Sequence, residues 1–169
     1  AVTEEELIEV KPEFMGFQTK GYVGAFPPKV EARIKLIVES PCLHLFSGTS
    51  KIGDMRIDLE RPEATLNMDV FEFIKNNNWV WKFVLADPPY KVQDRFGLAK
   101  TYANPTPMNT IRQNILGNYL RSHAENVLWF DLASPCPRGF YRYKTWMYLL
   151  GSWHHVRALT WLKRKGERL

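Results

Sequence analysis

The chain has 169 residues, of which 45% are hydrophobic and 24% are charged, and it carries a formal net charge of +5. These values are typical of one soluble globular domain with a sizeable core. No apolar run is long enough to span a membrane, and the acidic N-terminus differs from a signal peptide. We therefore expect an intracellular, cytoplasmic protein without a membrane partner. The positive charge fits a polyanionic partner such as nucleic acid.

The first half of the chain is predicted to alternate between helices and strands. Residues 1–25 form an N-terminal arm, and residues 26–169 form a single domain. The domain begins with a helix that starts at Pro27-Pro28 and ends before Pro41. Short strands are expected over residues 42–46, 55–59, 64–68 and 79–86, with a helical turn over residues 70–75. Only eight residues, 47–54, separate the first two strands, which predicts a shortened crossover without a helix.

The second half continues this alternation. Lys91 to Asn104 is expected to form a polar loop, and Thr106 caps a helix that closes at His123. The predicted buried stripe of this helix consists of Met108, Ile111, Ile115, Leu116, Tyr119 and Leu120. A strand over residues 127–132 follows, and strands over residues 144–150 and 156–162 form a hairpin. The pattern predicts an α/β fold with a doubly wound, mostly parallel sheet of about seven strands and an antiparallel C-terminal hairpin.

The most specific signal is an apolar strand ending at Ala86, followed at once by Asp87-Pro88-Pro89-Tyr90. Ligands bind outside the carboxyl ends of the strands in an open parallel sheet, so this turn is expected to point a carboxylate and a ring into a pocket. The two prolines fix φ and remove two backbone donors, which leaves acceptors suited to an exocyclic amino group. Tyr90 offers a flat face on which a base can stack.

This motif resembles the catalytic motif of the S-adenosylmethionine-dependent amino-methyltransferases, Rossmann-like enzymes that act on amino groups of adenine, cytosine or guanine in DNA or RNA. The order of elements across residues 26–163 also resembles the seven-stranded sheet of that family. The resemblance implies S-adenosylmethionine as cofactor and Asp87, Pro88, Pro89 and Tyr90 as catalytic residues. It implies methyl transfer to an exocyclic amine, most readily of adenine in DNA. Because the motif contains no cysteine, a cytosine ring-carbon methyltransferase is disfavoured.

The resemblance further implies a cofactor site near the ends of the first strands. Phe46-Ser47-Gly48 resembles the start of the family's cofactor loop, although His44 stands where an acidic residue is usual and Ser50 replaces the next glycine. In family order, Asp58 would bind the ribose, and Asp69 with Val70 would contact the adenine ring. Phe26 and Pro27 would line the methionine pocket. The implied set is Phe26, Pro27, Phe46, Ser47, Gly48, Asp58 (with Glu60 as substitute), Asp69, Val70 and Ala86. Structural roles remain open for several of them, since Asp69 also suits a helix N-cap and Asp58 a surface cap.

Two loops supply candidate cations for nucleic-acid binding, and both are expected to rim the same face of the sheet. Their residues are Lys91, Arg95 and Lys100 after the motif, and Arg138, Arg142 and Lys144 after the following strand. No segment is long enough to form a separate target-recognition domain, so recognition is expected from small loops or a specificity partner protein. The histidines and cysteines lack metal-ligand spacing, and no metal site is predicted.

Three alternatives remain open. The same chemistry could act on structured RNA, which would account for the absent recognition domain. The substrate could be a protein amide, although the usual motif for that reaction has Asn in place of Asp87. The chain could also be a degenerate, non-catalytic nucleic-acid-binding module that kept the fold. His44, Ser50 and the short crossover slightly favour this interpretation, and the intact Asp87-Pro88-Pro89-Tyr90 argues against it.

Overall fold

The structure, a computed structural model, describes residues 13–14, 26–88, 110–149 and 156–166. Several predictions lie outside these residues, namely the loop from Lys91 to Asn104, the cap at Thr106 and the position of Met108. The motif is divided in the same way, because Asp87 and Pro88 are described while Pro89 and Tyr90 are not.

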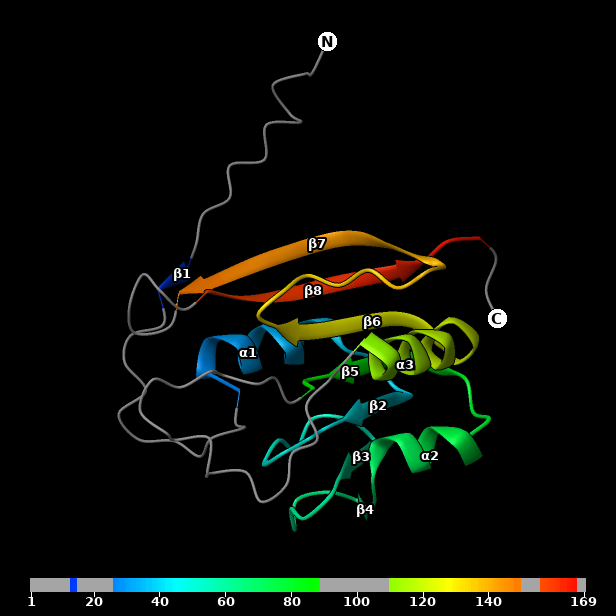
Figure 1. Cartoon of the computed structure of the whole chain (residues 1–169). Coiled ribbons are helices and arrows are strands. Elements are labelled where there is room, and N and C mark those ends of the chain that lie inside the picture. The colour runs from blue at the N-terminus through cyan, green and yellow to red at the C-terminus, as the bar shows by residue number, and fades with distance from the viewer. Residues whose placement is uncertain (1–12, 15–25, 89–109, 150–155, 167–169) are drawn as a thin grey trace.

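The described residues form an eight-stranded sheet with the order β1-β7-β8-β6-β5-β2-β3-β4 (Figure 1). The parallel part consists of β2 (Cys42–Leu45), β3 (Met55–Asp58), β4 (Leu66–Asn67), β5 (Trp81–Ala86) and β6 (Ala124–Asp131). β8 (Val156–Arg164) runs antiparallel to both β6 and β7 (Phe140–Leu149), and β1 (Glu13–Phe14) pairs parallel with β7. The predicted mostly parallel sheet with a C-terminal antiparallel hairpin is confirmed.

Helices cover both faces of the sheet. α1 (Pro28–Ile37) packs into a core cluster with Cys42 and Phe83. α2 (Val70–Asn76) and α3 (Thr110–His123) pack into a second cluster with Leu43 and Leu45. β5 lies between the two clusters and is buried apart from the half-buried Lys82, as expected of a strand covered on both sides.

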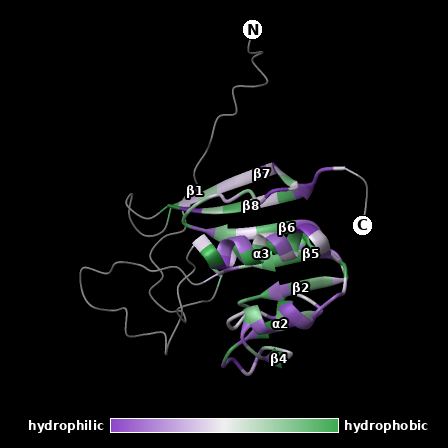
Figure 2. Ribbon diagram, turned by 45° about the vertical axis from the view of Figure 1, so that its right-hand side comes forward, coloured by the Kyte–Doolittle hydropathy of each residue, from purple (hydrophilic) through white to green (hydrophobic). Residues whose placement is uncertain are grey.

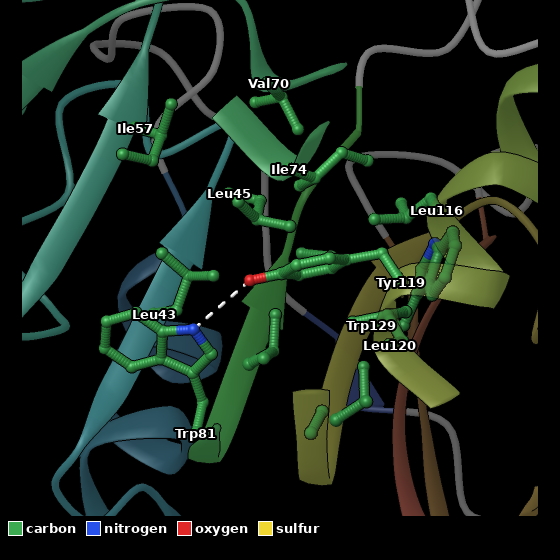
Figure 3. Packing of buried hydrophobic residues seen from close by; sticks show 14 of the residues in the cluster. Leu43, Leu45, Ile57, Val70, Ile74, Trp81, Leu116, Tyr119, Leu120 and Trp129 are labelled. Carbon is green, nitrogen blue, oxygen red and sulfur yellow. Dashed lines mark hydrogen bonds between the residues drawn. The ribbon is translucent and has the colours of Figure 1, made fainter. Parts of the chain in front are cut away.

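A hydrogen-bond chain inside the second cluster fixes α3 against β5. The Trp81 indole N–H donates to the Tyr119 hydroxyl at 3.2 Å (Figure 3), and that hydroxyl donates to Asn77 Oδ1 at 3.0 Å. Burial raises the pKa of Tyr119 to about 12. Because the hydroxyl remains protonated at neutral pH, it can hold both partners at once.

The predicted buried stripe of α3 is partly wrong. Leu116, Tyr119 and Leu120 are buried, but Ile111 is 68% exposed and Ile115 is 43% exposed. Successive helical residues are rotated by about 100°, so Ile115 lies about a quarter turn away from Leu116 and outside the stripe. The helix accordingly shows green and purple residues side by side along its length (Figure 2).

The connection from β2 to β3 contains no helix, as the sequence predicts. Asp54 stabilises this short crossover by accepting hydrogen bonds from the Cys42 amide at 2.7 Å and the Ser40 hydroxyl at 3.0 Å. The Ser47 amide donates to the Ile57 carbonyl at 3.0 Å, which ties the loop to β3. Extended chain held by these bonds therefore replaces the usual crossover helix.

The C-terminal hairpin begins earlier than predicted. β7 starts at Phe140 rather than at Lys144, so Arg142 and Lys144 lie within the strand and not in a loop. The register pairs Phe140 with Arg164, whereas Asp131 at the end of β6 pairs with Ala158. The start of β7 therefore lies near the amino-terminal end of the parallel strands. The chain returns across the sheet between Asp131 and Phe140 without a helix (Figure 1).

Candidate active site at the carboxyl ends of the strands

Asp87 directly follows β5, which lies between β6 and β2 in the parallel part of the sheet. Its amide donates to the Leu45 carbonyl of β2 at 3.4 Å, which extends the pairing of the two strands by one step. The chain leaves β2 toward β3 on one side and continues from β5 to β6 on the other, so the strand order reverses between β2 and β5. Ligand sites in doubly wound sheets lie at this kind of switch point.

The Asp87 side chain is electrostatically unusual. The residue is half-buried, and the following Pro88 is buried. Burial raises the pKa of Asp87 from its ordinary 3.8 to about 7, with Arg157 opposing this rise and Asp131 adding to it. A carboxyl group with this pKa can accept or release a proton near neutral pH, which is the property expected of a general base or acid.

Asp131 is a second carboxyl group at this edge, and the sequence analysis missed it. It ends β6 and is only 8% exposed. The Trp129 indole donates to Oδ2 at 3.2 Å, and the Leu132 amide donates to Oδ1 at 2.6 Å. Burial raises the pKa of Asp131 above its ordinary value. The signal that could have found it is simple, because Asp131 ends an apolar strand just as Asp87 does.

Arg157 lies beside these two carboxyl groups. Its neighbour Ala158 is the register partner of Asp131, and the guanidinium lies 5.7 Å from the centre of the Phe130 ring. The cation lowers the pKa of both Asp87 and Asp131, against the larger effect of burial. β5, β6 and β8 thus bring two carboxyl groups and one guanidinium group to the same edge of the sheet.

The loop after β2 contains two residues with left-handed backbone conformations, Phe46 with φ 60° and Gly48 with φ 52°. A bulky residue such as Phe46 rarely adopts this conformation, which costs on the order of 1–3 kcal/mol and tends to occur at functional sites. The Phe46 ring packs against the core, with its centre 6.3 Å from that of Phe71. The strained turn therefore lies where the sequence predicts the cofactor loop.

Asp58 closes this loop from the end of β3. Its Oδ2 accepts from the Gly48 amide at 2.9 Å, and its Oδ1 accepts from the amides of Glu60 and Arg61 at 3.1 Å each. A carboxylate has about four acceptor positions, so three backbone bonds leave room for a further donor. Asp58 is placed where the sequence predicts the ribose carboxylate, while Glu60, the substitute, is exposed.

Two buried polar atoms near this loop have no hydrogen-bond partner in the described part of the chain, His44 Nε2 and Ser47 Oγ. His44 is fully buried, and its Nδ1 lies 3.0 Å from the Ile52 carbonyl. Because a carbonyl can only accept, Nδ1 carries the hydrogen and Nε2 is left as an acceptor. Burial lowers the pKa of His44 to about 4, so the ring is neutral at pH 7. Unpaired buried polar atoms are uncommon and fit a place where a polar ligand binds.

The residues before α1 close the other side of the site. Phe26 is 7% exposed, stacks on His44 with ring centres 5.5 Å apart, and meets the Phe130 ring edge-on at 5.6 Å. The Phe26 ring therefore lies against both β2 and β6, as expected of a pocket wall. The buried Pro27 is the N-cap residue of α1.

Asp69 and Val70 begin α2. Asp69 caps this helix, because its Oδ1 accepts from the amides of Phe71 at 2.8 Å and Glu72 at 3.2 Å. Val70 belongs to the core and is 4% exposed. The structural role that the sequence allowed for Asp69 is thus present, and its contact with an adenine ring stays a prediction.

The second predicted group of cations does not lie at the edge of the sheet that carries Asp87. Arg142 and Lys144 belong to β7, and Arg138 lies just before that strand, toward the amino-terminal end of the parallel strands and away from Asp87. The Arg142 Nε donates to the carbonyl and the hydroxyl of Ser134, both at 3.0 Å. The expectation of a common rim is wrong for this group because β7 begins earlier than predicted. Lys91, Arg95 and Lys100 lie outside the described residues.

The described residues contain no group of three or more His, Cys, Asp or Glu side chains that could hold a metal ion. None of their helices is long and apolar enough to cross a membrane.

Comparison with known proteins shows the fold. No family model and no curated protein matches the chain. A solved structure described as "Putative methyltransferase yhhF from Escherichia coli" superposes with a TM-score of 0.50 at 16% sequence identity, covering 91% of this chain and 98% of that one. The chain therefore has an α/β, Rossmann-like fold. It shares that fold over nearly its whole length with the Escherichia coli protein.

Proposed function

We propose that the protein is an S-adenosylmethionine-dependent methyltransferase that acts on the exocyclic amino group of a nucleobase, most readily adenine in DNA. The observation that carries this proposal is the position of Asp87-Pro88. These residues place a half-buried carboxyl group with a pKa of about 7 at the topological switch point, beside a strained glycine loop. The motif and the fold point to the same chemistry.

Several residues fit the proposed cofactor. The Asp58 carboxylate has room for a ribose hydroxyl, and Gly48 lets the backbone approach a ligand closely. His44 Nε2 offers an acceptor to an ammonium group, and Ser47 Oγ offers a donor or an acceptor. Asp69 and Val70 are assigned to the adenine ring, and Phe26 to the wall of the methionine pocket. When bound, the cofactor supplies a methyl group activated by a sulfonium.

Asp87 has two tasks in this proposal. Its carboxylate first accepts a hydrogen bond from the amino group, which orients the nitrogen lone pair toward the methyl group. Transfer of the methyl group would break its bond to the sulfonium sulfur, release a neutral thioether and leave the nitrogen with one proton too many, which the Asp87 carboxylate would take. A carboxyl group with an ordinary pKa would hold it poorly at neutral pH, whereas burial makes Asp87 basic enough.

No covalent nucleophile takes part in this reaction. Cys42 begins β2, at the opposite end of the strand from the site, and burial raises the pKa of its thiol to about 12. Cys136 precedes β7, whose start lies toward the amino-terminal end of the parallel strands. Methylation of a ring carbon, which needs a thiolate at the site, is therefore disfavoured.

We assign base stacking to Tyr90 and phosphate contacts to Lys91, Arg95 and Lys100. The 26–169 domain contains no segment long enough to serve as a separate recognition domain. We propose these loops or a partner protein as the source of any sequence specificity.

The test is methyl transfer from labelled cofactor to panels of DNA and RNA, followed by nucleoside analysis. We expect N-methylated adenine from DNA, no turnover by Asp87→Ala, and nearly unchanged cofactor affinity of that variant in calorimetry. If only RNA is labelled, the substrate is RNA and not DNA. If a protein amide is labelled, the substrate is a protein and not a nucleic acid. Wild-type turnover by Asp87→Ala, or a methyl group on a ring carbon, would refute the mechanism. If the protein does not bind the cofactor, the result would support the alternative that it is a non-catalytic nucleic-acid-binding module.

A further inference from the structure

On the side of the sheet that faces α1, side chains of α1 contact the end of β7, whereas large aromatic side chains near the start of β7 are exposed. Near the end of that strand, Arg33 of α1 donates to the Tyr148 hydroxyl at 2.5 Å and lies 5.1 Å from the centre of the Trp146 ring. Near its start, Tyr141 and Tyr143 are each 43% exposed. Doubly wound sheets normally cover both faces with helices, so exposed large aromatics on a strand of such a sheet need a reason.

Four side chains gather at this place and form what we call the β7–β8 surface: Tyr143, Lys144, Trp161 and Lys163. The rings of Tyr143 and Trp161 meet edge-on with centres 4.9 Å apart. Lys163 Nζ lies 3.7 Å from the centre of the Tyr143 ring and 4.9 Å from that of Trp161. Lys144 Nζ lies 5.5 Å from the Tyr143 ring. Rings and cations thus alternate, in contrast to a purely apolar patch.

A β-bulge produces this arrangement. Arg142 pairs with Leu162 and Lys144 pairs with Trp161, so Tyr143 is the extra residue of β7 without a partner in register. Without the bulge, neighbouring residues would point to opposite faces of the sheet. With it, Tyr143 and Lys144 both reach the same ring cluster. Bulges re-aim side chains in this way and are frequent beside functional sites.

We propose that the β7–β8 surface binds single-stranded nucleic acid, with a base on the exposed Tyr143 ring and phosphates on Lys144 and Lys163. Exposed rings interleaved with cations are the combination that binds single strands without reading their sequence. The net charge of +5 favours the same partner. An apolar protein partner fits less well, because two lysines lie among the rings.

The surface is offset along the strands from the candidate active site, because Trp161 pairs with Leu128 and Lys163 with Asn126, whereas Asp131 at the end of β6 pairs with Ala158. Two strand spacings, about 10 Å, also separate β8 from β5, the strand that precedes Asp87. A nucleic-acid strand that delivers a base to Asp87 would have to extend over several nucleotides to lie on this surface as well. In that respect the inference rests on the proposed function, because it assumes a nucleic-acid substrate.

The test is fluorescence anisotropy with a labelled single-stranded oligonucleotide over a range of salt concentrations, using the full chain. Tyr143→Ala should weaken binding about tenfold with an unchanged salt slope, and Tyr143→Phe should bind nearly as wild type. Lys144→Ala should reduce the slope of log affinity against log salt by about 0.7, the contribution of one phosphate contact on a single strand. The matched control is Lys75→Ala, an exposed lysine on α2, which should leave the slope unchanged.

Thermal denaturation of each variant checks that the fold is intact. Wild-type binding by a folded Tyr143→Ala and a folded Lys144→Ala would overturn the proposal. A dimer that Tyr143→Ala dissociates, measured by light scattering, would overturn it too, because a second copy would then cover the surface. These results leave methyl transfer untouched, so they are distinguishable from failure of the proposed function, which would show as no transfer to any nucleic acid.

Discussion

Replacing Asp87 with asparagine should remove activity and yet stabilise the protein at alkaline pH. The folded-state pKa of about 7 lies above the ordinary value of 3.8, so between these values the folded state holds a proton that the unfolded state has released. Stability therefore falls as the pH rises from about 4 to about 7. Asparagine has nearly the same shape and no charge, and it avoids this loss.

The magnitude follows from the size of the pKa rise. Each pKa unit corresponds to about 1.36 kcal/mol, so a rise from 3.8 to about 7 amounts to at most about 4 kcal/mol above pH 8. For a domain of this size, that upper limit corresponds to a gain in Tm on the order of 10 °C. The actual gain will be smaller, because Asp87 is partly exposed to solvent.

The assay is thermal and urea unfolding of wild type and Asp87→Asn at pH 4 and at pH 8.5. The variant should be more stable than wild type at the higher pH and nearly equal at the lower one. The buried His44 affects both proteins alike and cancels in the difference. Glu60→Gln, an exposed carboxylate with the same charge change, is the control and should give no such pattern. Equal stability differences at both pH values would refute the argument for a desolvated Asp87.

Three further predictions concern other parts of the molecule. Asp58→Ala should weaken cofactor binding at least about tenfold in calorimetry, because a ribose hydroxyl and the glycine loop both lose an acceptor; unchanged affinity would move the ribose contact elsewhere. Leu116→Ala should cost about 2–5 kcal/mol in urea unfolding, whereas Ile111→Ala should stay within about 0.5 kcal/mol, and equal losses would contradict the placement of α3. In the folded protein at pH 8, a thiol reagent should modify Cys136 and spare Cys42, whose buried thiol has a pKa of about 12; rapid modification of both would argue against that burial.

Much of the candidate site could be predicted because its carboxylates stand at the ends of strands that the sequence pattern itself predicts. Asp58 ends β3 and Asp87 follows the apolar β5, and the carboxyl ends of parallel strands meet at one edge of the sheet. Asp131 follows the same rule, but no familiar motif accompanies it. Its importance becomes visible only when the register places Arg157 beside it.

The local sequence by itself determined the alternation of helices and strands, the short crossover after β2, and the carboxylate at the end of β5. These features depend on periodicity, chain length and proline stereochemistry, all of which act between neighbours in the chain. Only the tertiary structure decided the electrostatic state of Asp87, the exposure of Ile111 and Ile115, and the separation of Arg142 from the site. Burial and strand register arise from contacts between residues distant in sequence, and no local pattern reports the desolvation or the charges that those contacts create.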